Sequence, residues 1–291
     1  MAIYLDPKND LTFKRVFGEH KHLCISLINS MLPLDKPIVS IEYQTNELIP
    51  ILTDVLRNTI VDVRCTDKAG RQFLVEMQLY WNESFKSRVL LNASKAYVNQ
   101  LEKADKLSLI KPVYALNFVN GVFEKSAKMA KEYYHYYKIV NINDTEKQIK
   151  GLEFLFIELP KFKPQSRNQK KLHKLWMRFL TEINENTTEV SEDLLANQDI
   201  REAIEYMERS AYTKEELDSY YKWKIDSMTA QDMLDSAEAI GLEKGLEKGK
   251  MEEKIEIAIN LLKSGISIDI VNSATGLSIK QIEELIDKTK K

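Results

Sequence analysis

Three side chains that could do chemistry lie on two neighbouring apolar segments of this chain. The stretch RNTIVDVRCTDKAGRQFLVEMQLYW, residues 57–81, places Asp62 on the first segment and Glu76 and Gln78 on the second. Both segments are rich in β-branched and aromatic residues, and a short polar sequence separates them, so the stretch predicts a β-hairpin. Buried positions of a strand rarely carry a carboxylate, so these polar residues need a physical explanation.

The register of the hairpin follows from its loop. Gly70 ends a three-residue Lys-Ala-Gly loop and supplies the left-handed conformation that such loops need at their last position. Counting back along both strands then places Asp62 directly opposite Glu76 and Ile60 opposite Gln78. A slip of one residue would put the two carboxylates on opposite faces of the sheet.

The alternation of residue types gives the hairpin two unlike faces, because successive side chains of a strand point to opposite sides. The predicted polar face carries Asp62, Arg64, Leu74, Glu76, Gln78 and Tyr80. The predicted apolar face carries Val61, Val63, Cys65, Phe73, Val75, Met77 and Leu79.

Two directly opposed carboxylates favour a metal site. Their Cβ atoms lie about 4.5–5.5 Å apart, and like charges at that separation are destabilising unless a cation or a shared proton relieves them. Carboxylate and water oxygens suit Mg²⁺, with Mn²⁺ as the alternative ion, and such a metal can activate water for attack on a phosphodiester. The alternative is a solvent-facing hairpin whose acids pair with basic neighbours and do no chemistry. Helices on both faces of the sheet would bury the pair and favour a functional site.

The preceding segment predicts a single N-terminal helix. Apolar residues recur at helical spacing from Phe13 to Met31, and the sequence LPLDKP ends the pattern because proline cannot extend a helix. Asp6, which precedes a proline, is the first candidate for the N-cap, and Asn9 and Asp10 are competing candidates.

The remaining segments extend this pattern to the order helix, three strands, helix, strand. The first strand is expected within residues 38–48, the second helix from Ser84 to about Ala104, and the next strand within 111–123. Two overlapping apolar stripes mark that helix: Val89, Ala93, Ala96 and Gln100, and Leu90, Ala93, Tyr97 and Leu101. Residues 132–144 and 151–162 predict further strands or an edge extension of the same sheet.

This order of elements, with Asp62 on the second strand and the sequence Glu-Met-Gln from Glu76 to Gln78 on the third, resembles the PD-(D/E)XK nuclease fold. The segments DLTFKRVFG, IVDV and GRQFLVEMQL, Arg88 on the following helix, and the C-terminal GLEKGLEKGK and TGLS resemble the Rpn, or recombination-promoting nuclease, family, also described as transposases. The resemblance implies an α/β fold with a restriction-endonuclease-like mixed sheet flanked by helices and a helical C-terminal extension.

The resemblance also implies an activity, that of a Mg²⁺-dependent DNA endonuclease linked to recombination or mobile elements, with Asp62 and Glu76 as metal ligands. Gln78 stands where the general nuclease motif has lysine, and it matches the glutamine usual in this subfamily. A glutamine amide can orient the attacking water or donate to a phosphate oxygen, but it carries no positive charge. A competing hypothesis is a non-catalytic nucleic-acid-binding or protein-interaction protein that has retained the nuclease fold.

Three further residues complete the candidate site. Asp10 is either an additional catalytic acid on the first helix or an N-cap. Lys14 and Arg88 are candidate contacts for DNA phosphates, and the alternatives for both are solvated side chains or salt bridges across the seam between helix and sheet.

Four parts are expected along the chain. These are a nuclease-like core at residues 1–160, a helical extension at 161–236, a charged linker helix at 237–254 and a small helix-turn-helix-like module at 255–291. Acidic residues on the last helix favour a helical clip or an oligomerisation module over a DNA-reading helix.

Composition sets the remaining expectations. The formal net charge of −2 gives no global attraction to nucleic acid, so DNA binding requires a local patch. Cys24 and Cys65 have no metal-ligand spacing, and neither a signal peptide nor a membrane-length apolar run occurs, so we expect a cytoplasmic protein without membrane contact. Cutting both DNA strands usually needs two active sites, which favours a homodimer.

Overall fold

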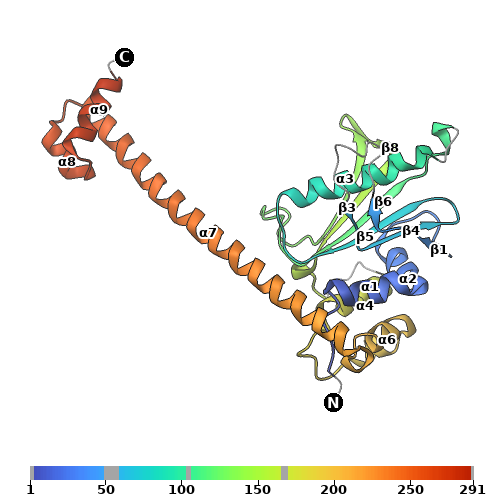
Figure 1. The fold of residues 1–291 in the computed structure, drawn as a ribbon. Coiled ribbons are helices and arrows are strands. Elements are labelled where there is room, and N and C mark those ends of the chain that lie inside the picture. Colours follow the sequence, from blue (N-terminus) through green and yellow to red (C-terminus); the bar gives the residue numbers. More distant parts are fainter. Residues whose placement is uncertain (1–2, 49–58, 103–105, 165–169, 290–291) are drawn as a thin grey trace. The chain divides into compact units, whose positions relative to one another are not determined.

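The structure, a computed structural model, describes residues 3–48, 59–102, 106–164 and 170–289 (Figure 1). Two compact units divide the chain, the first spanning Met1–Lys224 and the second Ile225–Lys291. None of the helices within the described ranges has both the length and the apolar character needed to cross a membrane.

In the described part of the first unit, six strands form one mixed sheet in the order β1-β4-β5-β6-β8-β7. Their bounds are Ile41–Tyr43 for β1, Val63–Asp67 for β4, Gln72–Gln78 for β5, Val113–Val119 for β6, Tyr134–Asn141 for β7 and Asp144–Glu158 for β8. Strands β5, β6 and β8 are parallel, β4 is antiparallel to both of its neighbours, and β7 is antiparallel to β8. The expected α/β class is confirmed, and β7 and β8 extend the same sheet as predicted.

The central hairpin has the predicted register. Val63 pairs with Val75, which ends the ladder, and Asp62 and Glu76 are the next residues of the two segments. The predicted pairing of Ile60 with Gln78 is wrong, because Ile60 pairs with Glu47 instead. Gly70 has a φ of 82°, which confirms the left-handed conformation expected at the end of the loop. The loop geometry therefore determines which side chains meet across the hairpin.

The predicted face of Val61 is wrong. Val61 packs in the same cluster as Leu74, on the opposite side of the sheet from Val63. The chain bends at Asp62, one residue before β4 begins, and the Val61 N–H donates to the Asn46 carbonyl at 3.1 Å. The bend interrupts the alternation of faces, so an even count along the strand does not continue through it.

The first predicted strand is also shorter than expected. Within residues 38–48 the chain forms β1 and, separately, β2, Glu47–Leu48, which pairs with β3, Thr59–Ile60. Between the two strands, the Asn46 side chain donates from Nδ2 to the Asp62 carbonyl at 2.9 Å. This contact holds the edge of the sheet close to the bend.

Helices cover both faces of the sheet (Figure 1). Helices α1 (Asp10–Glu19), α2 (Lys21–Met31), α4 (Lys171–Glu182) and α6 (Gln198–Glu205) pack on the face that carries Val63 and Val75. At the centre of that cluster the Phe17 ring centroid lies 5.3 Å from that of Trp176 and 4.8 Å from that of Phe13. Shorter elements of this unit are α5 (Glu192–Leu195) and the 3₁₀ turns Asn99–Glu102, Leu107–Leu109, Leu159–Lys161 and Arg209–Ala211.

Helix α3, Ser84–Val98, covers the other face, where Leu74 and Glu76 lie. The first predicted stripe is confirmed, because Val89, Ala93 and Ala96 are buried. The second is wrong at its two leucines: Leu90 and Leu101 are 51% and 41% exposed, whereas Ala93 is buried and Tyr97 packs against the same cluster. The predicted helix end near Ala104 lies outside the described residues.

The N-terminal helix differs from the prediction in its start and its continuity. Asn9 is the N-cap, and its side chain accepts a hydrogen bond from Leu11 N, whereas the Asp6 side chain accepts from Lys8 N in the preceding turn. At His20 the backbone is extended and separates α1 from α2. The break allows each helix to pack its own apolar stripe against the sheet, which one straight rod of that length could not do.

The second unit consists of the C-terminal part of α7 (Lys214–Lys263) with α8 (Ile268–Thr275) and α9 (Ile279–Thr289). The predicted boundaries of α8 are confirmed: Ser267 is its N-cap and Gly276, with φ of 68°, is its left-handed C-cap. Ala258, Val271, Leu277 and Ile282 form the buried core of this unit. Residues 237–254, expected to form a charged linker helix, lie within α7.

Candidate active site

Ion pairs, a hydrogen bond and electrostatic interactions link the six predicted site residues, which lie on α1, at the bend before β4, at the end of β5 and on α3. The Lys14 Nζ atom lies 2.6 Å from Asp10 Oδ1 and 3.9 Å from Asp62 Oδ1. Across the hairpin, Asp62 interacts electrostatically with Glu76, and Arg88 interacts with Glu76 in the same way. Four separate elements therefore contribute charged groups to one site.

Asp62 is held by the backbone of the neighbouring strand. Its Oδ2 accepts a hydrogen bond of 2.7 Å from Met77 N, and its side chain is only 20% exposed. Burial raises the pKa of Asp62 to about 7, and the nearby charges of Asp10 and Glu76 act in the same direction. The Met77 N–H and the Lys14 ammonium lower this pKa, but they do not offset the burial.

Glu76 is more deeply buried, at 7% exposure, and one side chain supports it. Asn92 on α3 donates from Nδ2 to Glu76 Oε1 at 3.0 Å. Burial raises the pKa of Glu76, while the Asn92 hydrogen bond and the Arg88 charge lower it in part. The Asn92 Oδ1 atom is buried and accepts no hydrogen bond from the described residues.

Sequence reasoning did not identify Asn92. The signal was present, since Asn92 follows Phe85 and Val89 at spacings of seven and three and lies in the buried stripe of α3. A lone amide among buried apolar positions needs a polar partner, and the strand beneath it supplies Glu76.

Gln78 and Arg88 form a second contact between sheet and helix. The Gln78 side chain donates from Nε2 to the Tyr80 carbonyl at 2.7 Å and accepts at Oε1 from the Arg88 guanidinium. Arg88 is exposed and lies over the Phe85 ring, with Cζ 4.9 Å from the ring centroid. The guanidinium is therefore positioned beside the carboxylates with accessible donors.

Asp10 and Lys14 form an ion pair one helical turn apart. Asp10 is the first residue of α1 and Asn9 is the cap, so the N-cap alternative for Asp10 is wrong. Lys14 reaches across the seam between helix and sheet toward Asp62, which is the salt-bridge alternative stated for this lysine. The side chains of Asp10 and Lys14 remain accessible, at 45% and 36% exposure.

The donor set fits a divalent ion that binds few protein ligands. No group of three or more histidine, cysteine or acidic side chains is arranged for a metal within the described ranges. Mg²⁺ typically takes one or two carboxylates and keeps its other positions for water and phosphate oxygens. Asp62 and Glu76 provide that pair, and their pKa values are raised by burial, which the nearby charges of Lys14 and Arg88 do not offset.

A mixed sheet between helical layers, with two opposed acids beside its parallel strands, defines a nuclease-fold protein of the restriction-endonuclease-like class. Nucleases of this class generally use divalent metals. The chain belongs to the PD-(D/E)XK nuclease family transposases, whose family model matches residues 7–237. No curated protein matches the chain, and no solved structure matches it.

Proposed function

We propose that this protein is a Mg²⁺-dependent DNA endonuclease, with Mn²⁺ as a substitute ion, that hydrolyses phosphodiester bonds at Asp62 and Glu76. The observation that carries the proposal is a pair of opposed, buried carboxylates, both with raised pKa values. Burial of such a pair costs free energy, and a bound cation would offset that cost. Membership in a nuclease family supports the same activity.

In this proposal Asp62 and Glu76 hold the metal through their carboxylate oxygens. Divalent-metal chemistry of this kind polarises a phosphoryl oxygen and makes water a stronger nucleophile. The Met77 N–H fixes the Asp62 carboxylate, and Asn92 fixes that of Glu76, so both acids are oriented before any ligand arrives.

Lys14 and Asp10 have supporting roles beside the carboxylate pair. The Lys14 ammonium lies between the carboxylates of Asp10 and Asp62. With a divalent cation held at Asp62 and Glu76, the Asp62 carboxylate would be neutralised without the Lys14 ammonium, which would then be available to contact a DNA phosphate. Asp10, which interacts electrostatically with Asp62, would accept a hydrogen bond or a proton from water beside the pair.

Gln78 and Arg88 divide the role that a lysine has in the general nuclease motif. Arg88 supplies the positive charge and contacts the phosphate, because its guanidinium is exposed beside Glu76. Once Arg88 turns to the phosphate, Gln78 Oε1 becomes available to orient the attacking water.

The test is nicking of supercoiled plasmid DNA by the wild type with Mg²⁺ and with EDTA, beside the variants Asp62→Asn and Glu76→Gln. Asp144→Asn, at the first residue of β8, is the matched control for loss of one acid. We expect cleavage by the wild type and the control with Mg²⁺, and losses of at least about 100-fold in both site variants. Equal activity in all four proteins, or activity that persists in EDTA, would contradict the mechanism.

The competing function is that of a non-catalytic binding protein with a retained nuclease fold. The observation in its favour is that Gln78 uses both polar atoms of its amide within the protein. Calorimetric titration with Mn²⁺ separates the two functions, because a binding protein has no reason to hold a metal at the carboxylate pair. We further propose a cytoplasmic homodimer acting in recombination or mobile-element transfer, which sedimentation and cell fractionation can check.

A further inference from the structure

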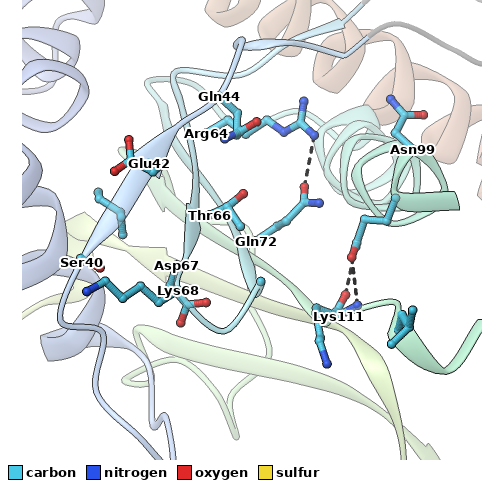
Figure 2. Close-up of a pocket in the computed structure, with 14 residues that line it drawn as sticks. Ser40, Glu42, Gln44, Arg64, Thr66, Asp67, Lys68, Gln72, Asn99 and Lys111 are labelled. Carbon is cyan, nitrogen blue, oxygen red and sulfur yellow. Dashed lines mark hydrogen bonds between the residues drawn. The ribbon is translucent and has the colours of Figure 1, made fainter. Parts of the chain in front are cut away.

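A polar cavity of about 520 Å³ lies away from the carboxylate pair, between strands β1, β4 and β5 and the end of α3 (Figure 2). Its lining includes Glu42, Arg64, Thr66, Lys68, Gln72 and Lys111. Ile41 and Leu109 are the apolar side chains of the lining, and most of the other lining side chains are polar or charged, so the cavity can offer hydrogen bonds and charge to a ligand.

Three cations in the cavity have no acidic partner among the described residues, namely Arg64, Lys68 and Lys111. Arg64 donates to the Gln72 Oε1 atom at 3.2 Å and to the Thr45 carbonyl at 3.4 Å. Its buried Nε meets no acceptor in the described chain, and burial lowers the pKa of its guanidinium. Because the terminal nitrogens of Arg64 donate to neutral acceptors, its guanidinium carries a charge that no described acid balances.

The two acids that line the same cavity are neutralised from outside it. The Glu42 carboxylate pairs with Lys21 at 2.8 Å. Asp67 pairs with Arg71 at 2.7 Å and also accepts the backbone N–H groups of Ala69 and Arg71. The uncompensated charge of the cavity is therefore positive.

The backbone of Lys111 is fixed at the cavity edge. Gln100 on the turn after α3 donates to the Lys111 carbonyl at 3.0 Å and accepts from its N–H at 2.9 Å. The Lys111 side chain passes the hairpin loop so closely that a Cβ at Gly70 would lie 3.0 Å from its Cγ. Lys111 is thereby held beside the hairpin loop at the edge of the cavity that Lys68 also lines (Figure 2).

The cavity lies on the face of the sheet that holds the carboxylates. Arg64 and Thr66 follow Asp62 along β4, and a strand rises about 3.3 Å per residue, so they lie about 7 and 13 Å beyond it. A DNA strand rises about 3.4 Å per nucleotide, so one backbone covers that distance in a few nucleotides.

We propose that Arg64, Lys68 and Lys111 form a phosphate-binding subsite that holds the nucleic-acid backbone a few nucleotides from the bond to be cut. The inference rests on the proposed nuclease function for the nature of its ligand. The cavity supplies what the chain as a whole lacks, a local positive patch in a protein with a net charge of −2.

The test is binding of a short fluorescein-labelled DNA duplex, followed by anisotropy in EDTA over a range of salt concentrations, so that no cleavage occurs. The variants are Arg64→Gln, Lys68→Gln and Lys111→Gln. Arg201→Gln on α6 and Lys150→Gln on β8 are matched controls, since both side chains are exposed and neither forms an ion pair with a described residue. Each subsite variant should reduce the salt slope by about 0.9 and raise Kd about five-fold near 0.15 M salt.

Because Lys68 is exposed, Lys68→Gln tests the inference even if Arg64→Gln fails to fold. Thermal unfolding of every variant checks that the chains remain folded. The inference is overturned if the subsite variants match the controls in slope and Kd, or if the wild type shows no salt-dependent binding. Loss of binding in the subsite variants together with no Mg²⁺-dependent cleavage by the wild type would leave the subsite standing and refute the nuclease.

Discussion

The Asp62 carboxylate accepts a 2.7 Å hydrogen bond from the backbone N–H of Met77, the residue that follows Glu76 on β5. This bond joins the bend before β4 to the neighbouring strand where the regular ladder has ended. The hydrogen bond orients the Asp62 carboxylate through the backbone N–H of the residue next to Glu76. The geometry of the two acids is therefore a property of the hairpin itself, present before any ligand binds.

Asp62→Asn should stabilise the protein above neutral pH in the absence of metal. The folded-state pKa of Asp62 is raised to about 7, so ionisation destabilises the fold progressively from about pH 4 to pH 7. Asparagine retains an acceptor for Met77 N–H without the charge, and we expect a gain of about 2–4 kcal/mol near pH 8. Urea unfolding of the wild type and the variant at about pH 8 and at about pH 4 measures this gain. An equal gain at about pH 4 would show that the charge of Asp62 is not the cause.

Asn92→Leu should weaken metal binding and shift its pH dependence upward. The Asn92 amide lowers the pKa of Glu76, so its removal leaves the carboxyl protonated to a higher pH. We expect about 10- to 100-fold weaker Mn²⁺ binding near neutral pH, with partial recovery at alkaline pH. A calorimetric titration over several pH values checks this. Loss of affinity that is the same at every pH would indicate a packing defect instead.

Gly70→Ala should destabilise the hairpin. Its φ of 82° is unfavourable for an alanine, and the added Cβ would meet Lys111 Cγ at 3.0 Å. The expected loss in the free energy of unfolding is about 1–2 kcal/mol. Ala69→Gly, at the preceding loop position, is the control for the entropy of the unfolded chain. A neutral Gly70→Ala variant would show that the loop does not require the left-handed residue.

Phe17→Ala should be among the most destabilising substitutions in the first unit. The ring is fully buried between Phe13 and Trp176, so its removal leaves a cavity that costs about 3–5 kcal/mol. Leu90→Ala, on the exposed side of α3, should change stability by no more than about 0.5 kcal/mol. Thermal or urea unfolding compares the two. Similar losses would mean that the buried stripes of these helices are assigned incorrectly.

Local rules were sufficient for the parts of the fold set by neighbouring residues. Gly70 fixed the hairpin loop and with it the opposition of Asp62 and Glu76. The caps at Ser267 and Gly276 followed from the same kind of local preference. Each depends on a few adjacent dihedral angles, which residue type determines directly.

Features that depend on tertiary packing were not accessible in the same way. The bend at Asp62 reverses the face of Val61, and it is held by Asn46, a residue distant in sequence. Asn92 reaches Glu76 only because α3 packs across that face of the sheet. Periodicity indicates that a side chain is buried, but not which group will meet it.

The measurement that tests the central claim most directly is a crystal structure of the protein soaked with Mn²⁺, with anomalous scattering used to locate the ion. The account predicts one site bound by carboxylate oxygens of Asp62 and Glu76, with Lys14 withdrawn from Asp62. The same soak of Glu76→Gln should show no ion there. An ion elsewhere on the chain, or a pair without metal and Lys14 still beside Asp62, would contradict it.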